Sequence, residues 1–283
     1  ATGAGHLAGA SRASTDRERC DWMRLVSVVG GFGRVEGADV IPMGADLVSW
    51  LAGEPAHDSA PRRLADLVLL APVPRPGKIV CVGLNYRDHA AETGKPVPTE
   101  PVLFAKFANS VVPDGATVVI PAATQEVDWE AELGVVIGRR ASRVSHRAAL
   151  DHVAGYTCLN DLSARDLQRS GGQWTRGKAI DGFLPMGPCL VTAAAVPDPS
   201  ALGISCTVNG EVVQDSSTKE MVFGVAELVS IISQTMTLEP GDCIATGTPP
   251  GVGMARTPPW FLAAGDEVVV EIEQIGRLTT HIA

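Results

Sequence analysis

From residue 78 onward, apolar residues come in short runs that end at Gly, Pro, Asn or Asp, and such runs are typical of β-strands. Within residues 204–214, the dipeptide Asn209-Gly210 separates two alternating segments, which favours a two-residue hairpin. Strands are therefore expected at residues 78–83, 102–107, 117–121, 132–138, 155–161, 187–192, 204–214, 242–247 and 266–276.

Helical spacing is rarer in the chain, and strands do not alternate regularly with helices. Apolar residues recur at intervals of three and four positions, which indicates helices, at residues 87–94, 145–154, 162–171 and 223–236. Many strands with few helices predict an α+β, β-rich fold whose larger domain is a mixed β-sandwich roll.

A proline-rich stretch, APVPRPGK at residues 71–78, indicates a domain boundary. We expect a small N-terminal α+β domain at residues 23–74 and the larger domain at residues 75–283. Residues 1–22 lack the apolar segment of a signal peptide, so we interpret them as an extension or tag before Met23.

The glycines in GGFGRVEG, residues 30–37, loosely match a dinucleotide-binding loop. Gly31 and Gly33 fit, but Glu36 stands where the third glycine belongs, and no helical pattern follows. The pattern therefore favours hairpin turns over a nucleotide site.

Composition limits the partners that we expect. The chain has 283 residues, of which 45% are apolar, enough for a packed core. A net charge of −9 and an aromatic content of 5% argue against nucleic acid and against an anionic membrane surface. No apolar run reaches the roughly 20 residues of a membrane-spanning helix.

The six cysteines are dispersed, and none forms a CxxC pair. This spacing excludes zinc-ribbon and thioredoxin-like motifs. Because cysteines in apolar surroundings are most simply reduced core residues, we expect a cytoplasmic protein.

Three acids stand at alternate positions in the segment DWEAELGVVIG, namely Asp128, Glu130 and Glu132. In a strand they would share one face, where like charges repel one another. The segment is either a solvated acidic edge or a site for a hard divalent cation such as Mg²⁺ or Mn²⁺. Asp161, at the end of the strand expected at 155–161, is a candidate third ligand, although spacing alone does not decide between these interpretations.

His89 and Glu92 are three positions apart, so a helix places them on one face. A carboxylate beside a histidine orients the ring for general-base catalysis, but an exposed helical turn explains the same spacing. Lys178 follows a glycine-rich segment and is either a group that stabilises an oxyanion or a solvated side chain.

Taken together, five stretches resemble the fumarylacetoacetate hydrolase family, in its order and spacing. The resemblance extends from about residue 78 to the C-terminus, and the preceding segment is similar to the small N-terminal domain of many members. The matching stretches are VGLNYRDHAAETG, DWEAELGVVIGRRA, AGYTCLNDLSARDLQ, GGQWTRGKAIDGFLPMGP and PGDCIATGTPPGVG.

The resemblance implies that Glu130, Glu132 and Asp161 bind Mg²⁺ or Mn²⁺, whose charge would offset the crowded acids. Asp128 is not carried over as a ligand, because its place varies in the family. It is interpreted as a residue beside the ligands or at the end of the strand.

The resemblance also assigns catalytic and substrate-binding roles. His89 and Glu92 match the pair that activates water, and Lys178 matches the lysine that stabilises charge on the substrate. The positions that match substrate-binding residues are Arg165, Gln168 and Thr248.

Two positions are less clear. Lys106 matches a lysine that is common after the strand before it, without an assigned role. Where close relatives tend to have Ser-Phe-Asp after the lysine, this chain has Ala179, Ile180 and Asp181, so we expect the substrate pocket to differ.

The expected activity is metal-dependent hydrolysis of a C–C bond in a 2,4-dioxo acid of the acylpyruvate type. This reaction gives pyruvate or a related oxo acid and a carboxylic acid. Oxaloacetate decarboxylation, isomerisation of a 2-hydroxy-dienoate, and a catalytically silent binding protein of the same fold are the alternatives. The expected partner is a small anionic oxo acid, and the expected assembly is a homodimer through the larger domain.

Overall fold

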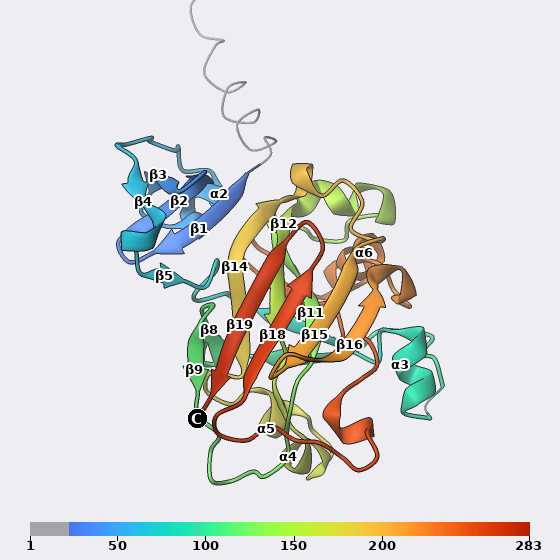
Figure 1. Ribbon diagram of the computed structural model, residues 1–283. Coiled ribbons are helices and arrows are strands. Elements are labelled where there is room, and N and C mark those ends of the chain that lie inside the picture. The colour runs from blue at the N-terminus through green and yellow to red at the C-terminus, as the bar shows by residue number, and fades with distance from the viewer. Residues whose placement is uncertain (1–22, 95) are drawn as a thin grey trace, which may run out of the picture.

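Two β-sheets packed face to face make up the centre of the computed structural model, which describes residues 23–94 and 96–283 (Figure 1). The larger sheet has 12 strands, and its main path runs β4-β3-β2-β1-β14-β12-β11-β17-β6-β7. These strands are β1 (Arg24–Val28), β2 (Gly31–Glu36), β3 (Asp39–Gly44), β4 (Arg62–Arg63), β6 (Ile79–Gly83), β7 (Val102–Lys106), β11 (Ala131–Ile137), β12 (Val153–Asn160), β14 (Leu184–Thr192) and β17 (Cys243–Ala245), with β5 (Leu69–Leu70) on β1 and β8 (Val111–Val112) on β14.

The second sheet has 5 strands in the order β16-β15-β18-β19-β9, and a separate pair joins β10 to β13. Their bounds are β9 (Ala116–Val118), β10 (Val127–Asp128), β13 (Ser163–Ala164), β15 (Gly203–Val208), β16 (Glu211–Ser217), β18 (Glu267–Ile272) and β19 (Gly276–Ile282). The α-helices are α2 (Leu47–Ala52), α3 (Arg87–Glu92), α4 (Arg165–Arg169), α5 (Thr175–Lys178) and α6 (Val225–Thr235). This architecture confirms the expected α+β, β-rich fold class.

The central strand β11 is buried on both faces, as its nearly continuous apolar sequence requires. Leu133, Val135 and Ile137 belong to the core that includes residues of the second sheet. Val136, which points to the opposite face, belongs to the core that includes residues of α2 and β1. Glu132 shares the alternation of Val136, so its carboxylate lies on this second face at the end of the strand.

The N-terminal strands extend the larger sheet because β1 pairs with β14, with Leu25 opposite Leu190 (Figure 1). Gly30 and Gly37 have φ angles of 91° and 61° in the turns that follow β1 and β2, so hairpins replace any nucleotide loop here. The domain boundary expected near residue 75 stays a prediction, and the extension at residues 1–22 lies outside the described residues.

Other local expectations have mixed outcomes. Asn209 and Gly210 have φ angles of 52° and 81° and connect β15 to β16, which confirms the predicted hairpin. The helix expected at residues 145–154 is wrong in type, because His146–His152 form a 3₁₀ helix before β12 begins. Across the described residues, no helix is both long and apolar enough to span a bilayer.

Candidate active site

The acidic segment does not form one continuous strand. It breaks after Asp128, where β10 ends, and resumes at Ala131, where β11 begins. Glu130 therefore lies in the break, and Glu132 is the second residue of β11. Asp161 directly follows β12, the neighbour of β11, and its N–H donates to the Glu130 carbonyl at 2.9 Å.

This arrangement brings together the three acids that the family resemblance predicts as metal ligands. One carboxylate oxygen each from Glu130, Glu132 and Asp161 lies within 4.8 Å of the others, and all three residues are buried. Such a set of oxygen donors fits a hard divalent cation.

Glu130 has cationic partners. Its Oε2 accepts from Lys178 Nζ at 2.6 Å, and its Oε1 pairs with Arg165 Nη1 at 2.7 Å. Burial alone raises the pKa of Glu130, but these two cations hold it at about 2. Burial lowers the pKa of Lys178, whereas Asp161 and Glu130 raise it, and the net shift is upward.

Glu132 lacks such compensation. Among the described residues, no lysine or arginine forms an ion pair with it, and its Oε2 accepts from the Gly247 N–H at 2.9 Å. Burial, followed by the charges of Asp161 and Glu130, raises the pKa of Glu132 well above its usual value. A divalent cation bound beside Glu132 would offset this crowding of negative charge.

Lys106, which had no assigned role, contacts the third acid. Its Nζ donates to Asp161 Oδ1 at 2.5 Å and to the Leu162 carbonyl at 3.0 Å, and the side chains of Lys106 and Asp161 are fully buried. Lys178 donates to the other oxygen, Asp161 Oδ2, at 2.8 Å. Lys106 therefore fixes the rotation of the Asp161 carboxylate.

Asp128 lies outside the acid cluster, as expected. It accepts from the N–H groups of Gly253 and Met254 at 2.6 and 3.1 Å and pairs with Arg165 Nε at 2.7 Å. Its carboxylate holds the loop after β17 against the break in the acidic segment.

The histidine–carboxylate pair lies on α3, which begins after Tyr86. His89 Nδ1 and Glu92 Oε2 are 2.9 Å apart, and Glu92 Oε1 accepts from the Gly251 N–H at 2.8 Å. Glu92 is held from two sides, so the ring of His89 has a fixed partner on Nδ1.

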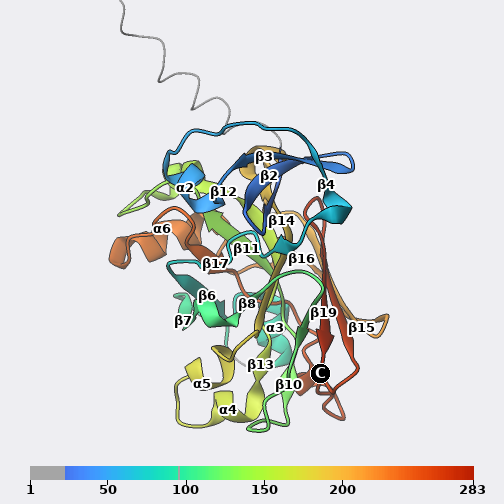
Figure 2. The same ribbon diagram turned by 90° about the vertical axis from the view of Figure 1, so that its left-hand side faces the viewer.

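Several of these groups line one pocket of about 330 Å³, whereas Asp161 and Glu92 lie behind its lining as partners of Lys178 and His89. Strands β6, β7 and β11, helices α3, α4 and α5, and the loop after β17 contribute to it, and α4 and α5 lie at the opposite end of the molecule from β1–β4 (Figure 2). The predicted site residues that line it are His89, Glu130, Glu132, Arg165, Gln168, Lys178 and Thr248.

The substrate-binding candidates provide hydrogen-bond donors in this pocket. Arg165 uses Nε and Nη1 on Asp128, Glu130 and Gln168, whereas its buried Nη2 has no partner within the described residues. An unpartnered buried guanidinium nitrogen that lines a pocket is suited to an anionic oxygen. Thr248 also lines the pocket and is 5% exposed.

Two aromatic rings form an apolar wall. Phe104 and Trp174 pack edge to face with centroids 5.2 Å apart, and Lys178 Nζ lies 5.0 Å from the centre of the Phe104 ring. A Cβ on Gly83 would lie 2.5 Å from a ring carbon of Trp174, so the indole packs directly on this backbone.

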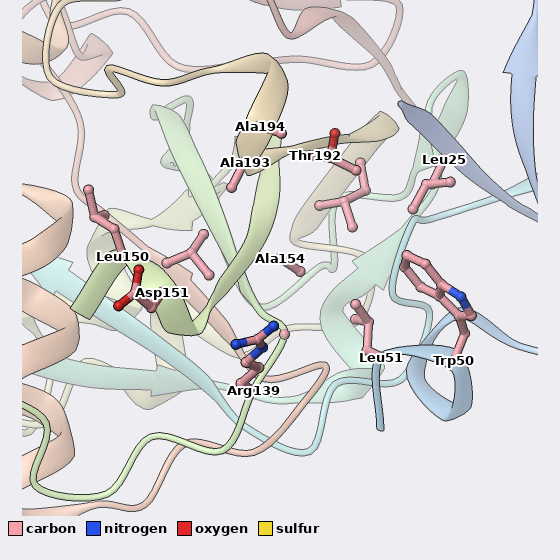
Figure 3. A pocket seen from close by; sticks show the side chains of 13 residues that line it. Leu25, Trp50, Leu51, Arg139, Leu150, Asp151, Ala154, Thr192, Ala193 and Ala194 are labelled. Atoms are coloured by element: carbon pink, nitrogen blue, oxygen red, sulfur yellow. The ribbon is translucent and has the colours of Figure 1, made fainter. Parts of the chain in front are cut away.

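A second cavity of about 360 Å³ lies away from the acids, between α2 and the ends of β12 and β14 (Figure 3). Leu25, Leu51, Leu150 and Leu190 give it a mainly apolar lining, with Arg139 as one of its charged residues. None of the three clustered acids lines this cavity, so we assign the chemistry to the first pocket.

The sequence comparison decides the family. The fumarylacetoacetate (FAA) hydrolase C-terminal family matches residues 78–283. This chain belongs to the fumarylacetoacetate hydrolase family. The resemblance read from the five stretches is thereby confirmed.

Individual family members differ in their named activities. The bovine protein named oxaloacetate tautomerase FAHD2A, mitochondrial, is 53% identical over 220 residues, which cover 77% of this chain and 70% of the relative. The structure of 2-hydroxyhepta-2,4-diene-1,7-dioate isomerase from Mycobacterium marinum is 38% identical with a TM-score of 0.80, covering 92% of this chain and 98% of that one. Fumarylacetoacetate hydrolase from Exiguobacterium antarcticum is 38% identical with a TM-score of 0.83 and the same coverage of 92% and 98%.

The cytoplasmic expectation is wrong in light of these relatives, because the bovine and human proteins are both named as mitochondrial. The expectation was based on reduced cysteines. The five cysteines in the described part of the chain are indeed buried without disulfides, but a buried thiol does not identify a compartment.

The departure from the family pattern after Lys178 lies outside the pocket. Ala179, Ile180 and Asp181 are not among its lining residues, and Asp181 Oδ1 accepts from Asn109 Nδ2 at 2.6 Å. Any effect of this departure on the pocket would therefore be indirect, and the expected difference in the substrate pocket stays a prediction.

Sequence reasoning missed Gln214, Phe104 and Trp174. Gln214 lies in a strand that the hairpin signal predicts. Its amide donates to Thr248 Oγ1 and to the Pro249 carbonyl in the loop after β17, and only the fold reveals these contacts. Phe104 lies two residues before Lys106, and the aromatic residue in the GGQW segment was the available signal for Trp174.

Proposed function

We propose that this chain interconverts the keto and enol forms of a small anionic 2-oxo acid, with oxaloacetate as the expected substrate. One observation carries the proposal: His89 with its partner Glu92, the Lys178 ammonium and two of the three clustered carboxylates, Glu130 and Glu132, come together at the same pocket. The name of the bovine relative, an oxaloacetate tautomerase, supports this choice of reaction.

In this proposal, Glu130, Glu132 and Asp161 hold Mg²⁺ or Mn²⁺, because both ions prefer oxygen ligands. When bound, the ion supplies Lewis-acid polarisation of the substrate oxo group.

Protein groups then bind the substrate and move the proton. Arg165 Nη2 and the Thr248 hydroxyl bind the carboxylate. Because Glu92 accepts from Nδ1–H of His89, Nε2 carries the lone pair and removes a proton from the carbon beside the oxo group. Lys178 stabilises the negative charge that develops on oxygen, and transfer of the proton to that oxygen gives the enol.

C–C bond hydrolysis of a 2,4-dioxo acid is the second candidate, and the similarity to a fumarylacetoacetate hydrolase favours it. The same His89 would take a proton from water, which would attack the distal carbonyl. Decarboxylation and dienoate isomerisation use the same charge stabilisation by Lys178 without water attack.

His89→Ala tests the proposal. With Mn²⁺ saturating, we expect enol–keto conversion of oxaloacetate, followed by ultraviolet absorbance, to slow by about 10²–10⁴-fold, because the general base is lost. His281→Ala is the matched control, since His281 is exposed and lies on β19 outside the pocket. Pyruvate release from acylpyruvates is measured in parallel.

Tautomerisation at an unchanged rate in His89→Ala would contradict the assignment of the base. Acylpyruvate cleavage by a wild-type protein that does not accelerate tautomerisation would replace the first candidate with the second.

A further inference from the structure

Gln214 connects the strand that carries the acids to the loop that carries Thr248. It lies on β16 of the second sheet, is 1% exposed, and makes three hydrogen bonds with its amide group. Oε1 accepts from the Ala131 N–H at 2.9 Å, and Nε2 donates to Thr248 Oγ1 and to the Pro249 carbonyl, both at 2.8 Å. Ala131 stands between Glu130 and Glu132, so one side chain touches both halves of the site.

The orientation of this amide follows from its partners. The backbone N–H of Ala131 can only donate, so it must face the oxygen of Gln214. The carbonyl of Pro249 can only accept, so it must face Nε2. The second hydrogen on Nε2 is then directed to Thr248 Oγ1, and a flipped amide would place like groups against each other at two of the three contacts.

This orientation sets the polarity of the Thr248 hydroxyl. Because its oxygen accepts from Gln214, its own hydrogen is available for a different acceptor. Thr248 lines the pocket, so this hydrogen is placed to reach an oxygen of a bound ligand. A hydroxyl in this polarity suits a carboxylate, which only accepts.

The loop is also fixed on β16 at its far end. Gly251 has a φ of 102°, and a Cβ there would lie 2.0 Å from the Val213 carbonyl oxygen. The pairing of β15 with β16 shifts register between Cys206 and Thr207, so Val213 is an extra residue in the strand. Gly251 also donates to Glu92, so the same contact region supports the histidine pair.

We infer that Gln214 is a positioning residue, which presents the Thr248 hydroxyl as a donor to the substrate carboxylate and fixes its place relative to Glu130 and Glu132. This inference rests on the proposed function for the identity of the ligand. It adds a specificity element from the second sheet, on a strand outside the five stretches that match the family pattern.

The test uses Gln214→Glu, which keeps the shape but replaces the donating amide nitrogen with an accepting oxygen. The probe is oxalate, a planar anion that resembles a 2-oxo acid, titrated by calorimetry into the Mn²⁺-saturated protein. We expect oxalate to bind about 10- to 100-fold more weakly, the usual effect of losing a hydrogen bond to a charged group. The KM for oxaloacetate should rise more than kcat falls. Gln234→Glu, an exposed glutamine on α6, is the matched control and should bind oxalate like wild type.

Thr248→Val and Thr248→Ser test the hydroxyl without altering Gln214. Valine should weaken oxalate binding to the level of Gln214→Glu, and serine should bind more tightly than valine. In the Thr248→Val background, Gln214→Glu should add less than about twofold, because Gln214 acts through this hydroxyl.

The outcomes separate the two proposals. Equal oxalate affinity in wild type and Gln214→Glu, or in Thr248→Val and Thr248→Ser, overturns the role of Gln214. If the losses in oxalate affinity caused by Gln214→Glu and Thr248→Val add up in the double variant, the role of Gln214 is overturned as well. If wild type binds oxalate with the expected pattern of variants but leaves oxaloacetate unchanged, the proposed function fails and the positioning role stands. If wild type does not bind oxalate, both are overturned.

Discussion

Glu130 and Glu132 lie two positions apart in the chain but differ in charge compensation. Lys178 and Arg165 pair with Glu130, whereas the Glu132 carboxylate is buried beside two other acids. Charge compensation, rather than spacing, therefore distinguishes the two acids.

Glu132→Gln separates metal binding from folding. Glutamine keeps the acceptor for the Gly247 N–H but removes a buried charge, so we expect the metal-free protein to be more stable than wild type in urea. Mn²⁺ affinity by calorimetry should fall by at least about tenfold, since even outer partners of a ligand contribute 10- to 100-fold. Unchanged Mn²⁺ binding would contradict the ligand assignment. Glu239→Gln, at an exposed surface pair, is the control.

Lys106→Met tests the buried pair with Asp161. Methionine fills similar space but leaves the carboxylate with one cation fewer, so we expect a loss of about 3–5 kcal/mol in the free energy of unfolding. Urea denaturation measures it, with the exposed Lys219→Met as the comparison. A loss no larger than that of Lys219→Met would mean that the pair does not stabilise the site.

At this scale, the sequence reveals the residues that carry the chemistry but not their partners. Acid spacing and the family pattern predict the members of the cluster. Lys106 and Gln214 stayed unassigned because their contacts, to Asp161 and to Thr248, join residues far apart in the chain. Contacts of this kind depend on how β7 and β16 pack.

Short elements position the site, and the residues at which they begin and end decide where the functional side chains lie. The break between β10 and β11 places Glu130 outside the ladder, where it faces Arg165 and Lys178. Periodicity predicts the long strands well because alternation persists through them. It does not predict this break, because acidic and apolar positions alternate across it without a glycine or proline.

The short helix α2 depends on its N-cap. Asp46 Oδ1 accepts from the N–H groups of Val48 and Ser49 at 2.8 and 3.0 Å, so Asp46→Ala should cost about 0.5–2 kcal/mol in unfolding free energy. The Ser49 hydroxyl and these N–H groups lower the pKa of Asp46 below its ordinary value of 3.8. The contribution is therefore present above pH 3.8 and is lost as the pH falls through the lowered pKa.

Urea unfolding of wild type and Asp46→Ala, at about pH 7 and at progressively lower pH, checks this sign. The difference between them should shrink in acid. The exposed Asp215→Ala serves as a control, and a difference that grows in acid would contradict the capping role.

On the scale of the whole molecule, β7 forms one end of the larger sheet. Val102, Leu103 and Phe107 are 38%, 37% and 54% exposed there. Because an open apolar strand edge invites pairing, we expect a homodimer that covers this surface.

Light scattering at micromolar concentration should give twice the mass of one chain. Phe107→Glu should shift the protein toward the monomer, whereas Val212→Glu, which changes a valine that is 60% exposed on β16, should not. A monomeric wild type would disprove the expected assembly.

The pairing of β1 with β14 has a consequence for any shortened form of this chain. β1 covers β14 at Leu190 and Val191, while β8 covers it at Leu184 and Pro185. A fragment that begins at residue 75 would retain every acid of the pocket but would expose the part of that strand edge that β1 covers, along with the apolar face that packs on α2. Such an edge is a template for aggregation. By pairing with β14, the N-terminal strands therefore protect the rest of the chain from edge-to-edge strand pairing with other molecules.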